Sequence, residues 1–598
     1  MDKKNTIIGA LLLVAAGAAF YFAPRPVPPP PAPAPGTASA QAPAATTPAS
    51  GGTAAAPAAG QPAAPMANPA SAAFAAVAGD AAGATVTTLA NDFIEVRFTD
   101  FGGAVRDVAL KKYPAVLGDP APFVFNVLHA DPMLALVDFP GLDRGTRFER
   151  VSHTATEVVY RAVFEGRLEV TRRYVLAPNA GEKTDPYQLR HETTFRNLTD
   201  KAVAPLRIAL SLGTAAPTNL QDPGLQLTAG FSTGDKQDFI KRGDLESSGG
   251  FFGVGAHDAK PVVTSGGPLV WTSVQNQFFT SILTPDEPAT SLTTRRVKLL
   301  PLQPDGTLNA YGLAATMQVD VKALAANGEA KVAGNLYVGP KEYRRLANSE
   351  VFKADQDKVM QFGFFKFFSQ ILLTLMTWIH GIVGSWGVAI ILTTLTLKTI
   401  FIYPTLAASR SAKRMAKLQP ELALLKEKFK DNPQKQQAAT MELFKTHKVN
   451  PVGGCLPILI TIPFFMGFFQ MLQSTAELRF APFLWAHDLA APDTVTHIFS
   501  LPLNIMPLLM GTTMLFQMRL TPSPSVDNAQ MKMMKFMPVI FTLFCYNFSC
   551  ALSLYSTING LFTIGQQLVV NRMKDPADAP APAGPGGKQL KNVTPKKK

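Results

Sequence analysis

Cysteine is scarce in this sequence of 598 residues. The three that occur, Cys455, Cys545 and Cys550, lie in strongly apolar stretches with no histidine or second cysteine at metal-ligand spacing. Disulfide frameworks and zinc sites both depend on such spacings. We therefore predict neither a disulfide framework nor a metal site.

Charged residues are also scarce. Lys, Arg, Asp and Glu make up 17% of the chain and hydrophobic residues 47%, whereas an average soluble domain carries about 25% charge. This composition argues against an ordinary soluble enzyme. The phosphate-binding motif Gly-x-x-x-x-Gly-Lys-Ser/Thr is missing, so we expect no nucleotide hydrolysis. Separately, we expect no cofactor.

The apolar residues are concentrated at the two ends of the chain. Residues 6–22 form an uncharged apolar run of seventeen residues, which is near the lower limit for a membrane helix. A cleaved signal peptide and a retained anchor are both open, and the aromatic residues that close the run favour a signal-anchor span over residues 1–22. Residues 23–84 are rich in Pro and Ala and predict a disordered linker.

From about residue 85 to residue 340 the pattern changes to short segments in which apolar and polar residues alternate. Clear examples are Phe93–Phe98, Glu157–Phe164 and Leu168–Val175. Alternation with period two, interrupted by turn residues, is typical of antiparallel strands. We therefore predict a large antiparallel β-sandwich domain over residues 85–340.

Two features of this domain bear on catalysis. Residues Gly230–Gly234 fit the Gly-x-Ser-x-Gly pattern of a hydrolase nucleophile, but they lie in a glycine-rich turn rather than between a strand and a helix. We therefore do not expect Ser232 to be catalytic. The histidines are scattered and are expected to be surface or structural residues; they are His129, His153, His191 and His257.

Beyond Pro340 the chain becomes helical and increasingly apolar. With residues 6–22, five further segments would give a polytopic α-helical bundle of about six spans, five of which form its core, and the last two adjoin so closely that a very tight turn is expected at Phe548–Ala551. The five segments are Trp386–Tyr403, Pro451–Leu472, Leu501–Met518, Phe536–Ala551 and Leu552–Val570.

Topology decides the role of one more apolar stretch, Phe362–Val383. If it lies flat on the membrane, the basic connecting segments share one side, which the positive-inside rule makes cytoplasmic, and the β domain and the loop 474–500 lie outside. A seventh span would destroy this asymmetry, so we predict an amphipathic interfacial helix within residues 341–384. The segments of the basic side carry net charges of +1 in residues 1–5, +6 in 407–450, +2 in 519–535 and +5 in 571–598.

The resulting plan assigns residues 385–406 to the second span and residues 451–573 to the other four. Residues 407–450 predict a basic helical hairpin, with Met441 and Phe444 of the second helix facing the first. This hairpin is either a solvated connector or a docking surface for a substrate chain or a ribosome-side partner. The docking residues would be Lys413, Arg414, Lys417 and Lys426. Residues 574–598 predict a disordered basic tail, which is either a topology device or a tether to anionic lipid or ribosomal RNA.

Lys398 is the most informative residue because it lies in an otherwise uncharged span. A basic side chain at the bilayer centre costs about 2.5–3.5 kcal/mol, so it should face protein or water. Snorkelling is the alternative, since Pro404 near the cytoplasmic end is only about 9 Å of helix rise away. Polar residues on the same helix face, four residues earlier, and on other predicted helices either link the helices or line, with Lys398, a hydrated cavity open to the cytoplasm, which we favour. They are Thr394, Gln470, Gln473, Ser556, Asn559, Thr563 and Gln566.

The sequence resembles the YidC/Oxa/Alb family of membrane protein insertases, in the YidC form of Gram-negative bacteria. The resemblance is strong from about residue 362 to residue 573 and weaker over the β domain. Phe548–Ala551 departs from it, because the family more often has Phe-Pro-Ser-Gly there. The matching motifs are Asn450–Pro457, Glu477–Phe483, Trp485–Leu489 and Phe536–Phe541.

The resemblance implies a hydrophilic groove that is open to the cytoplasm and to lipid, closed outside, and holds one basic residue. Counting back from Leu418-Gln419-Pro420 places Lys398 at the basic position and Thr394 at a lining position, whereas counting from Tyr403-Pro404 leads to Thr399, which has no charge. The β domain would be a super-sandwich similar to that of sugar-binding enzymes, without retained catalysis.

The same resemblance implies an insertase and chaperone of the bacterial inner membrane that is not an enzyme. The chain would be multi-pass, with both termini cytoplasmic and the large domain periplasmic. Its implied partners are nascent inner-membrane proteins, the Sec translocon, the ribosome, the signal recognition particle pathway and the lipid bilayer. Two rivals stay open: a transporter or channel that uses Lys398 as an anion site, and a membrane-anchored carbohydrate-active enzyme.

Overall fold

A computed structural model describes most of the chain between residues 83 and 573, together with a short strand at Phe74–Ala76. The predicted anchor, nearly all of the linker and the predicted tail lie outside the described residues. The chain divides into two compact units, Met1–Val359 and Met360–Lys598. Also outside the description are residues 129–130, 140, 178–183, 220–221, 248, 250–255, 300–310, 354, 431, 448–455, 500 and 521–528.

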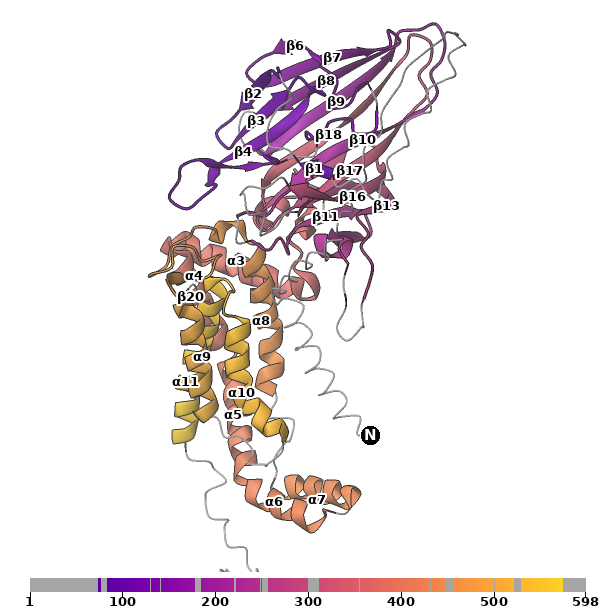
Figure 1. The fold of residues 1–598 in the computed structure, drawn as a ribbon. Coiled ribbons are helices and arrows are strands. Elements are labelled where there is room, and N and C mark those ends of the chain that lie inside the picture. The colour runs from indigo at the N-terminus through magenta and orange to yellow at the C-terminus, as the bar shows by residue number, and fades with distance from the viewer. Residues whose placement is uncertain are drawn as a thin grey trace, which may run out of the picture. The chain divides into compact units, whose positions relative to one another are not determined.

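The first unit is a largely antiparallel β-sandwich (Figure 1). Its largest sheet has nine strands in the order β12-β11-β14-β15-β18-β9-β8-β7-β6, and two further sheets run β1-β16-β17-β10, with β13 beside β16, and β2-β3-β4-β5. The strands are β1 (Phe74–Ala76), β2 (Val86–Ala90), β3 (Ile94–Thr99), β4 (Ala104–Pro114), β5 (Pro122–Phe125), β6 (Glu149–His153), β7 (Glu157–Phe164), β8 (Leu168–Leu176), β9 (Gln188–Asn197), β10 (Leu206–Ala215), β11 (Thr228–Ser232), β12 (Gln237–Lys241), β13 (Val262–Leu269), β14 (Trp271–Gln275), β15 (Phe279–Pro285), β16 (Ala289–Leu299), β17 (Tyr311–Val321) and β18 (Glu329–Pro340).

Alternation in the sequence becomes alternation of burial in the strands. Along β8, side chains from Leu168 to Leu176 are buried at every second position. Phe98 of β3 lies against Tyr174 of β8, with ring centroids 5.0 Å apart, and the Tyr174 hydroxyl donates to the Gly103 carbonyl at 2.7 Å. These contacts join two sheets into one core, which confirms the predicted sandwich.

The two features that could have suggested catalysis in this unit have structural roles. Ser232 is the last residue of β11, a turn rather than a helix follows it, and its hydroxyl donates to the Asp355 carboxylate. His191 is buried in β9 with Nε2 2.7 Å from the Thr193 hydroxyl, and burial lowers its pKa. His153 and His257 contact backbone carbonyls at the surface, and His129 lies outside the described residues.

The β unit continues past its predicted end at residue 340. Residues 341–359, which we assigned to the interfacial region, pack on the large sheet through α2 (Tyr343–Leu346) and η2 (Gln356–Met360). The Trp271 indole donates to Asp355 Oδ1 at 2.8 Å, and the Gln275 amide donates to the Val359 carbonyl at 3.0 Å. The predicted boundary was wrong because the period-two pattern stops with β18, whereas the residues after β18 still pack on the sheet.

Lys341, directly after β18, is a buried lysine and gives this unit a pH dependence. Its side chain is 2% exposed, its Nζ donates to the Asn276 carbonyl at 3.4 Å, and burial lowers its pKa from 10.5 to about 7. As the pH falls from 10.5 towards 7, the unfolded chain gains this proton and the folded chain does not. Stability from the neutral lysine is therefore lost on acidification and gained as the pH rises.

We expect the free energy of unfolding of the β unit to rise by about 2 kcal/mol between pH 7 and pH 9 through Lys341, since one pKa unit corresponds to about 1.36 kcal/mol. Lys341→Met should lack this contribution. Urea unfolding of the full-length protein and of the variant at both pH values measures the difference. Equal pH dependence in the two proteins would contradict the assignment.

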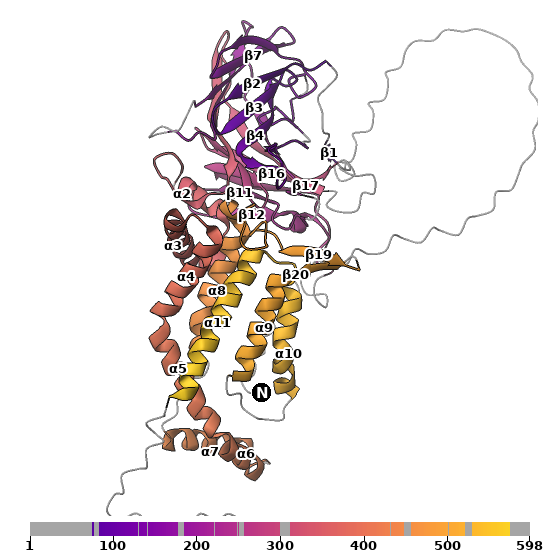
Figure 2. The ribbon, with the colours of Figure 1, turned by 90° about the vertical axis from the view of Figure 1, so that its left-hand side faces the viewer.

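The second unit is helical (Figure 2). Helices α4, α8, α9, α10 and α11 run side by side, and α3 crosses one end of them. The elements are η3 (Gly363–Phe365), α3 (Lys366–Val383), α4 (Trp386–Ile400), α5 (Ile402–Lys417), α6 (Gln419–Lys428), α7 (Pro433–Thr446), α8 (Leu456–Ser474), η4 (Ala476–Leu478), β19 (Thr494–Ile498), β20 (Leu501–Asn504), α9 (Ile505–Leu520), α10 (Ala529–Phe544) and α11 (Cys550–Arg572).

Each of the five segments beyond residue 385 that were predicted as spans contains a helix in its described part, but several of their bounds differ. The span starting at Leu501 begins instead with strand β20, and its helix starts at Ile505. The next helix, α10, starts and ends seven residues before the predicted Phe536–Ala551. Its first turns contain Lys and Gln, which hydropathy excludes although both are good helix formers. The connection to α11 therefore covers residues 545–549 rather than a very tight turn at Phe548–Ala551.

Among the described residues, one helical segment, Gly363–Val383, is long and apolar enough to cross a membrane unaided. Trp386–Ile400 and Ile402–Lys417 qualify as a pair bent by 62°. The first segment comprises η3 and α3, which exposes Phe367, Trp378 and Ile382 on one face while Leu372, Leu373 and Met376 are buried on the other. This two-faced pattern fits an interfacial helix, and the number of spans stays a prediction.

Candidate functional site

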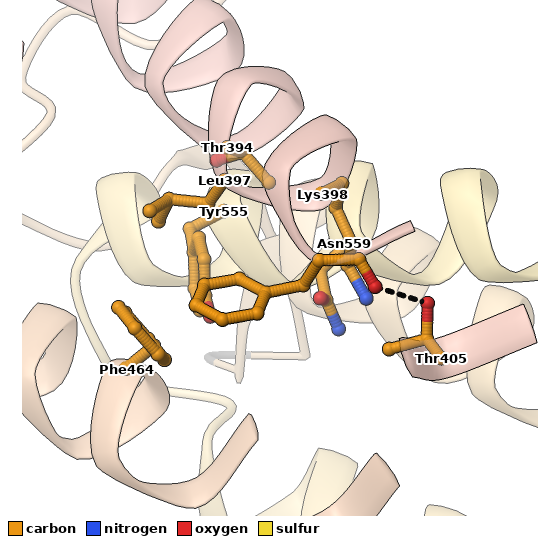
Figure 3. Close-up of a pocket in the computed structure, with 8 residues that line it drawn as sticks. Thr394, Leu397, Lys398, Thr405, Phe464, Tyr555 and Asn559 are labelled. Atoms are coloured by element: carbon orange, nitrogen blue, oxygen red, sulfur yellow. Dashed lines mark hydrogen bonds between the residues drawn. The ribbon is translucent and has the colours of Figure 1, made fainter. Parts of the chain in front are cut away.

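A pocket of about 40 Å³ lies among α4, α5, α8 and α11 (Figure 3). A water needs roughly 10–15 Å³ of such space, so the pocket has room for a few waters. The residues that line it are Thr394, Leu397, Lys398, Phe401, Thr405, Phe464, Tyr555 and Asn559.

Lys398 lies in the last turn of α4 and extends toward Asn559 on α11 (Figure 3). Its ammonium donates to the Thr563 hydroxyl oxygen at 3.1 Å. The Thr563 hydroxyl in turn donates its proton to the Asn559 carbonyl at 2.7 Å. Because that proton is used within α11, the hydroxyl oxygen is left to accept from the lysine. A cation is also favoured at the carboxyl end of a helix.

In the part of the chain that the structure describes, no acidic side chain pairs with the Lys398 cation. Helices α3, α4, α5, α8, α9, α10 and α11 contain no Asp or Glu, and among the residues that the structure describes Lys398 makes no ion pair. The opposite wall of the pocket is apolar, with Phe464 from α8 and Tyr555 from α11. An anionic group that enters this pocket would therefore meet one unneutralised positive charge.

The bend between α4 and α5 keeps polar side chains directed at α11. The Thr405 hydroxyl lies 2.7 Å from the Phe401 carbonyl and 3.3 Å from Gln566 Oε1. Further along α5, the Lys413 ammonium donates to the carbonyls of Val570, Asn571 and Met573 at 3.0–3.2 Å. These last carbonyls have no partner within the helix, so Lys413 caps α11.

The structure brings together five of the eight predicted groove residues. Lys398, Thr394 and Asn559 line the pocket, and hydrogen bonds attach Thr563 and Gln566 to its polar side.

The other three predicted residues do not line it. Ser556 follows Tyr555 on α11, and Gln470 and Gln473 lie further along α8 than Phe464. A Cβ at Gly363 would be 3.1 Å from the Gln470 amide nitrogen, which places Gln470 beside η3. The two glutamines were grouped with Lys398 on polarity alone, without knowledge of their height in the bundle.

Sequence reasoning missed the aromatic wall and Thr405. Phe401 lies between α4 and α5, Phe464 on α8 and Tyr555 on α11, and no polar pattern in the sequence marks them. Thr405 lies seven residues after Lys398, which is about two helical turns. This spacing could have identified Thr405 if the predicted helix had been extended beyond residue 403.

The predicted helical hairpin is formed by α6 and α7. Leu418 and Leu422 are buried against Leu443 and Phe444, whereas Met441 is 45% exposed. The prediction was correct for Phe444 and wrong for Met441, whose place is taken by Leu443. Of the predicted docking residues, Lys413, Arg414 and Lys417 lie on α5 and Lys426 on α6.

The loop between α8 and β19 contacts the first turns of two helices, α9 and α11. Asp493 Oδ2 accepts hydrogen bonds from the Trp485 indole at 2.8 Å and from the Met506 amide, in the first turn of α9, at 2.7 Å. The amides of Cys550 and Ala551 donate to loop carbonyls at 2.8 and 2.9 Å. The loop thus caps the first turns of both α9 and α11.

Comparison with known proteins agrees with this architecture. A family model described as "60Kd inner membrane protein" matches residues 378–577, and one described as "YidC periplasmic domain" matches residues 86–375. The membrane protein insertase YidC of Marinobacter nauticus is 31% identical and the match covers 82% of each chain. That of Tolumonas auensis is 29% identical, over 81% of this chain and 86% of the relative.

Proposed function

Because this chain belongs to the YidC family of membrane protein insertases, we propose that it receives nascent membrane proteins at the pocket that contains Lys398. Family membership makes it an insertase of the inner membrane rather than an enzyme, with the β unit as its periplasmic domain. How the helical unit performs insertion is the proposal.

One observation carries it: among the described residues Lys398 is a cation without an acidic counter-charge, beside hydrogen-bonding groups and an aromatic wall. A charged residue at the bilayer centre costs about 2.5–3.5 kcal/mol. An acidic residue of the incoming segment would offset part of that cost by pairing with Lys398. The polar backbone next to that acidic residue would form hydrogen bonds with the side chains of Asn559, Thr563 and Thr405.

The apolar part of the substrate then needs no binding site. Once the polar segment has passed, an apolar helix is more stable in lipid than beside Lys398, so it leaves sideways into the bilayer. The loop between α8 and β19, which caps α9 and α11 at the end of the bundle near α3, supports a groove that is closed outside and open to the cytoplasm. Partition into lipid supplies the driving force, and no cofactor takes part.

The charge asymmetry supports a membrane orientation with both termini in the cytoplasm. In that orientation α6 and α7 form a cytoplasmic hairpin, and the helix that leads into it, α5, carries Arg410, Lys413, Arg414 and Lys417. We propose this basic end of α5, together with the hairpin, as a docking surface for a nascent chain or a ribosome. Action together with the Sec translocon and delivery by the signal recognition particle pathway complete the proposal. Lys413 contributes by capping α11 and thereby fixing α5 beside the pocket.

Site-specific crosslinking tests the pocket. A photoreactive residue at Thr394 or Asn559 should crosslink to a stalled nascent membrane protein, because both line the pocket. The matched control is Leu543 on α10, which is 70% exposed away from the pocket. Crosslinks from Leu543 without crosslinks from Thr394 and Asn559 would contradict this route.

A further inference from the structure

The β19–β20 hairpin exposes apolar side chains at its tip. Phe499 is 97% exposed and Leu501 71%. Ile498 pairs directly with Leu501, and Thr496 with Leu503, so these four side chains share one face of the hairpin. His497, which pairs with Pro502, lies on the opposite face. Exposed apolar surface of this kind marks an interaction site.

The base of the hairpin is held firmly. The Thr494 hydroxyl donates to Asn504 Oδ1 at 2.7 Å, and the Asn504 amide donates to the Tyr546 carbonyl at 2.8 Å. The Tyr546 hydroxyl donates to the Pro502 carbonyl at 2.6 Å. The hairpin is therefore fixed to the connection between α10 and α11, and its exposed tip has a defined position relative to the helices.

Its apolar surface continues into the helix that follows. Strand β20 ends at Asn504 and α9 begins at Ile505, and α9 exposes Leu508 and Phe516. Residues 494–518 contain no Asp, Glu, Lys or Arg. In an inner-membrane protein an exposed apolar helix face contacts lipid, so the hairpin is continuous with a lipid-facing surface.

The hairpin also lies at the level where a membrane surface is expected. Figure 2 shows β19 and β20 projecting sideways from the end of α9 and α10. This is the same end of the helices that α3 crosses, as both views of the ribbon show.

We propose that the β19–β20 hairpin rests in the headgroup region of the phospholipid bilayer, with Phe499, Ile498 and Leu501 directed into the upper acyl chains. The hydrophobic effect favours burial of these side chains. The outer edges of a two-stranded hairpin have unpaired backbone groups, which the hydrocarbon core does not tolerate. The interface satisfies both requirements, because water and headgroups reach the backbone while the apolar face contacts lipid. The hairpin is thus a second site of interaction, separate from the pocket, and its partner is the bilayer surface.

Depth-dependent fluorescence quenching tests this contact. An environment-sensitive fluorophore is attached at Leu501→Cys, on the apolar face, in the full-length protein, with the three native cysteines replaced by alanine and one protein in each nanodisc of phosphatidylethanolamine and phosphatidylglycerol. We expect emission at shorter wavelength than from the same label at Lys236→Cys, an exposed position of the β unit. Lipids with a nitroxide near the headgroup should quench the label at position 501 more than iodide does.

His497→Cys is the matched control, because it lies on the opposite face of the same hairpin. Its label should be quenched more by iodide and less by the nitroxide lipids than the label at position 501. Water-like emission at position 501 would overturn the proposal. Shielding from iodide without quenching by lipid would also overturn it, and would assign the apolar face to a protein partner instead.

Discussion

Replacing Lys398 with alanine will slow the insertion of substrates that have an acidic residue in their translocated segment by about tenfold to a hundredfold. A hydrogen bond to a charged group contributes about 1.5–3 kcal/mol, and each 1.4 kcal/mol is a factor of ten. Lys398→Arg keeps the charge and should keep most of the activity. Protease protection of the translocated segment in reconstituted vesicles measures the rate.

Thr399→Ala is the matched control for this variant. Thr399 is exposed, its hydroxyl donates to the Leu395 carbonyl at 2.8 Å, and the alternative counting from Tyr403-Pro404 would put it at the groove position instead of Lys398. We expect insertion by this variant to be unchanged. A loss with Thr399→Ala and none with Lys398→Ala would show that the wrong residue was assigned.

Replacing Asp355 with alanine will destabilise the β unit by about 3 kcal/mol or more. The Asp355 carboxylate is 9% exposed and accepts hydrogen bonds from the Trp271 indole and the Gln237 amide, both at 2.8 Å, and from the Ser232 hydroxyl. Each buried donor left without an acceptor costs about 1–3 kcal/mol. Hydrogen exchange of the full-length protein should show faster exchange in β11, β12 and β14.

Asp355→Asn provides the graded control, because its remaining oxygen still accepts from one or two of the donors. Its effect on exchange should be smaller than that of Asp355→Ala. Neither change should alter hydrogen exchange in α4, the helix that carries Lys398. Unchanged exchange in Asp355→Ala would refute the view that residues 341–359 are held to the sheet by this carboxylate.

The strands of the β unit were predictable where one face of a strand is buried. Glu157–Phe164 matches β7 residue for residue, since alternating burial leaves a direct trace in the sequence. Sheet order and the docking of residues 341–359 were not predictable, because both depend on contacts between segments far apart in the chain. Asp355 gives no local signal that it will meet Trp271.

The helical unit shows the same limit at its helix ends. Hydropathy merged the apolar residues of β20 with α9, since Leu501 and Leu503 suit a helix as well as a strand. It also did not reveal the bend at Phe401, where α4 ends. Lys398, Thr394 and Asn559 could be found because helical spacing and a lone charge are visible in sequence. Phe464 and Tyr555 could not, since their place in the pocket depends on how helices pack.

Charge reversal at Lys398 tests the central claim most directly. The insertion rate of one substrate is measured in reconstituted vesicles with either an acidic or a basic residue in its translocated segment, using the unaltered protein and Lys398→Glu. We predict that Lys398→Glu slows the acidic substrate and speeds the basic one, so that the preference between them is reversed. An unchanged preference would contradict the claim that Lys398 acts through its charge.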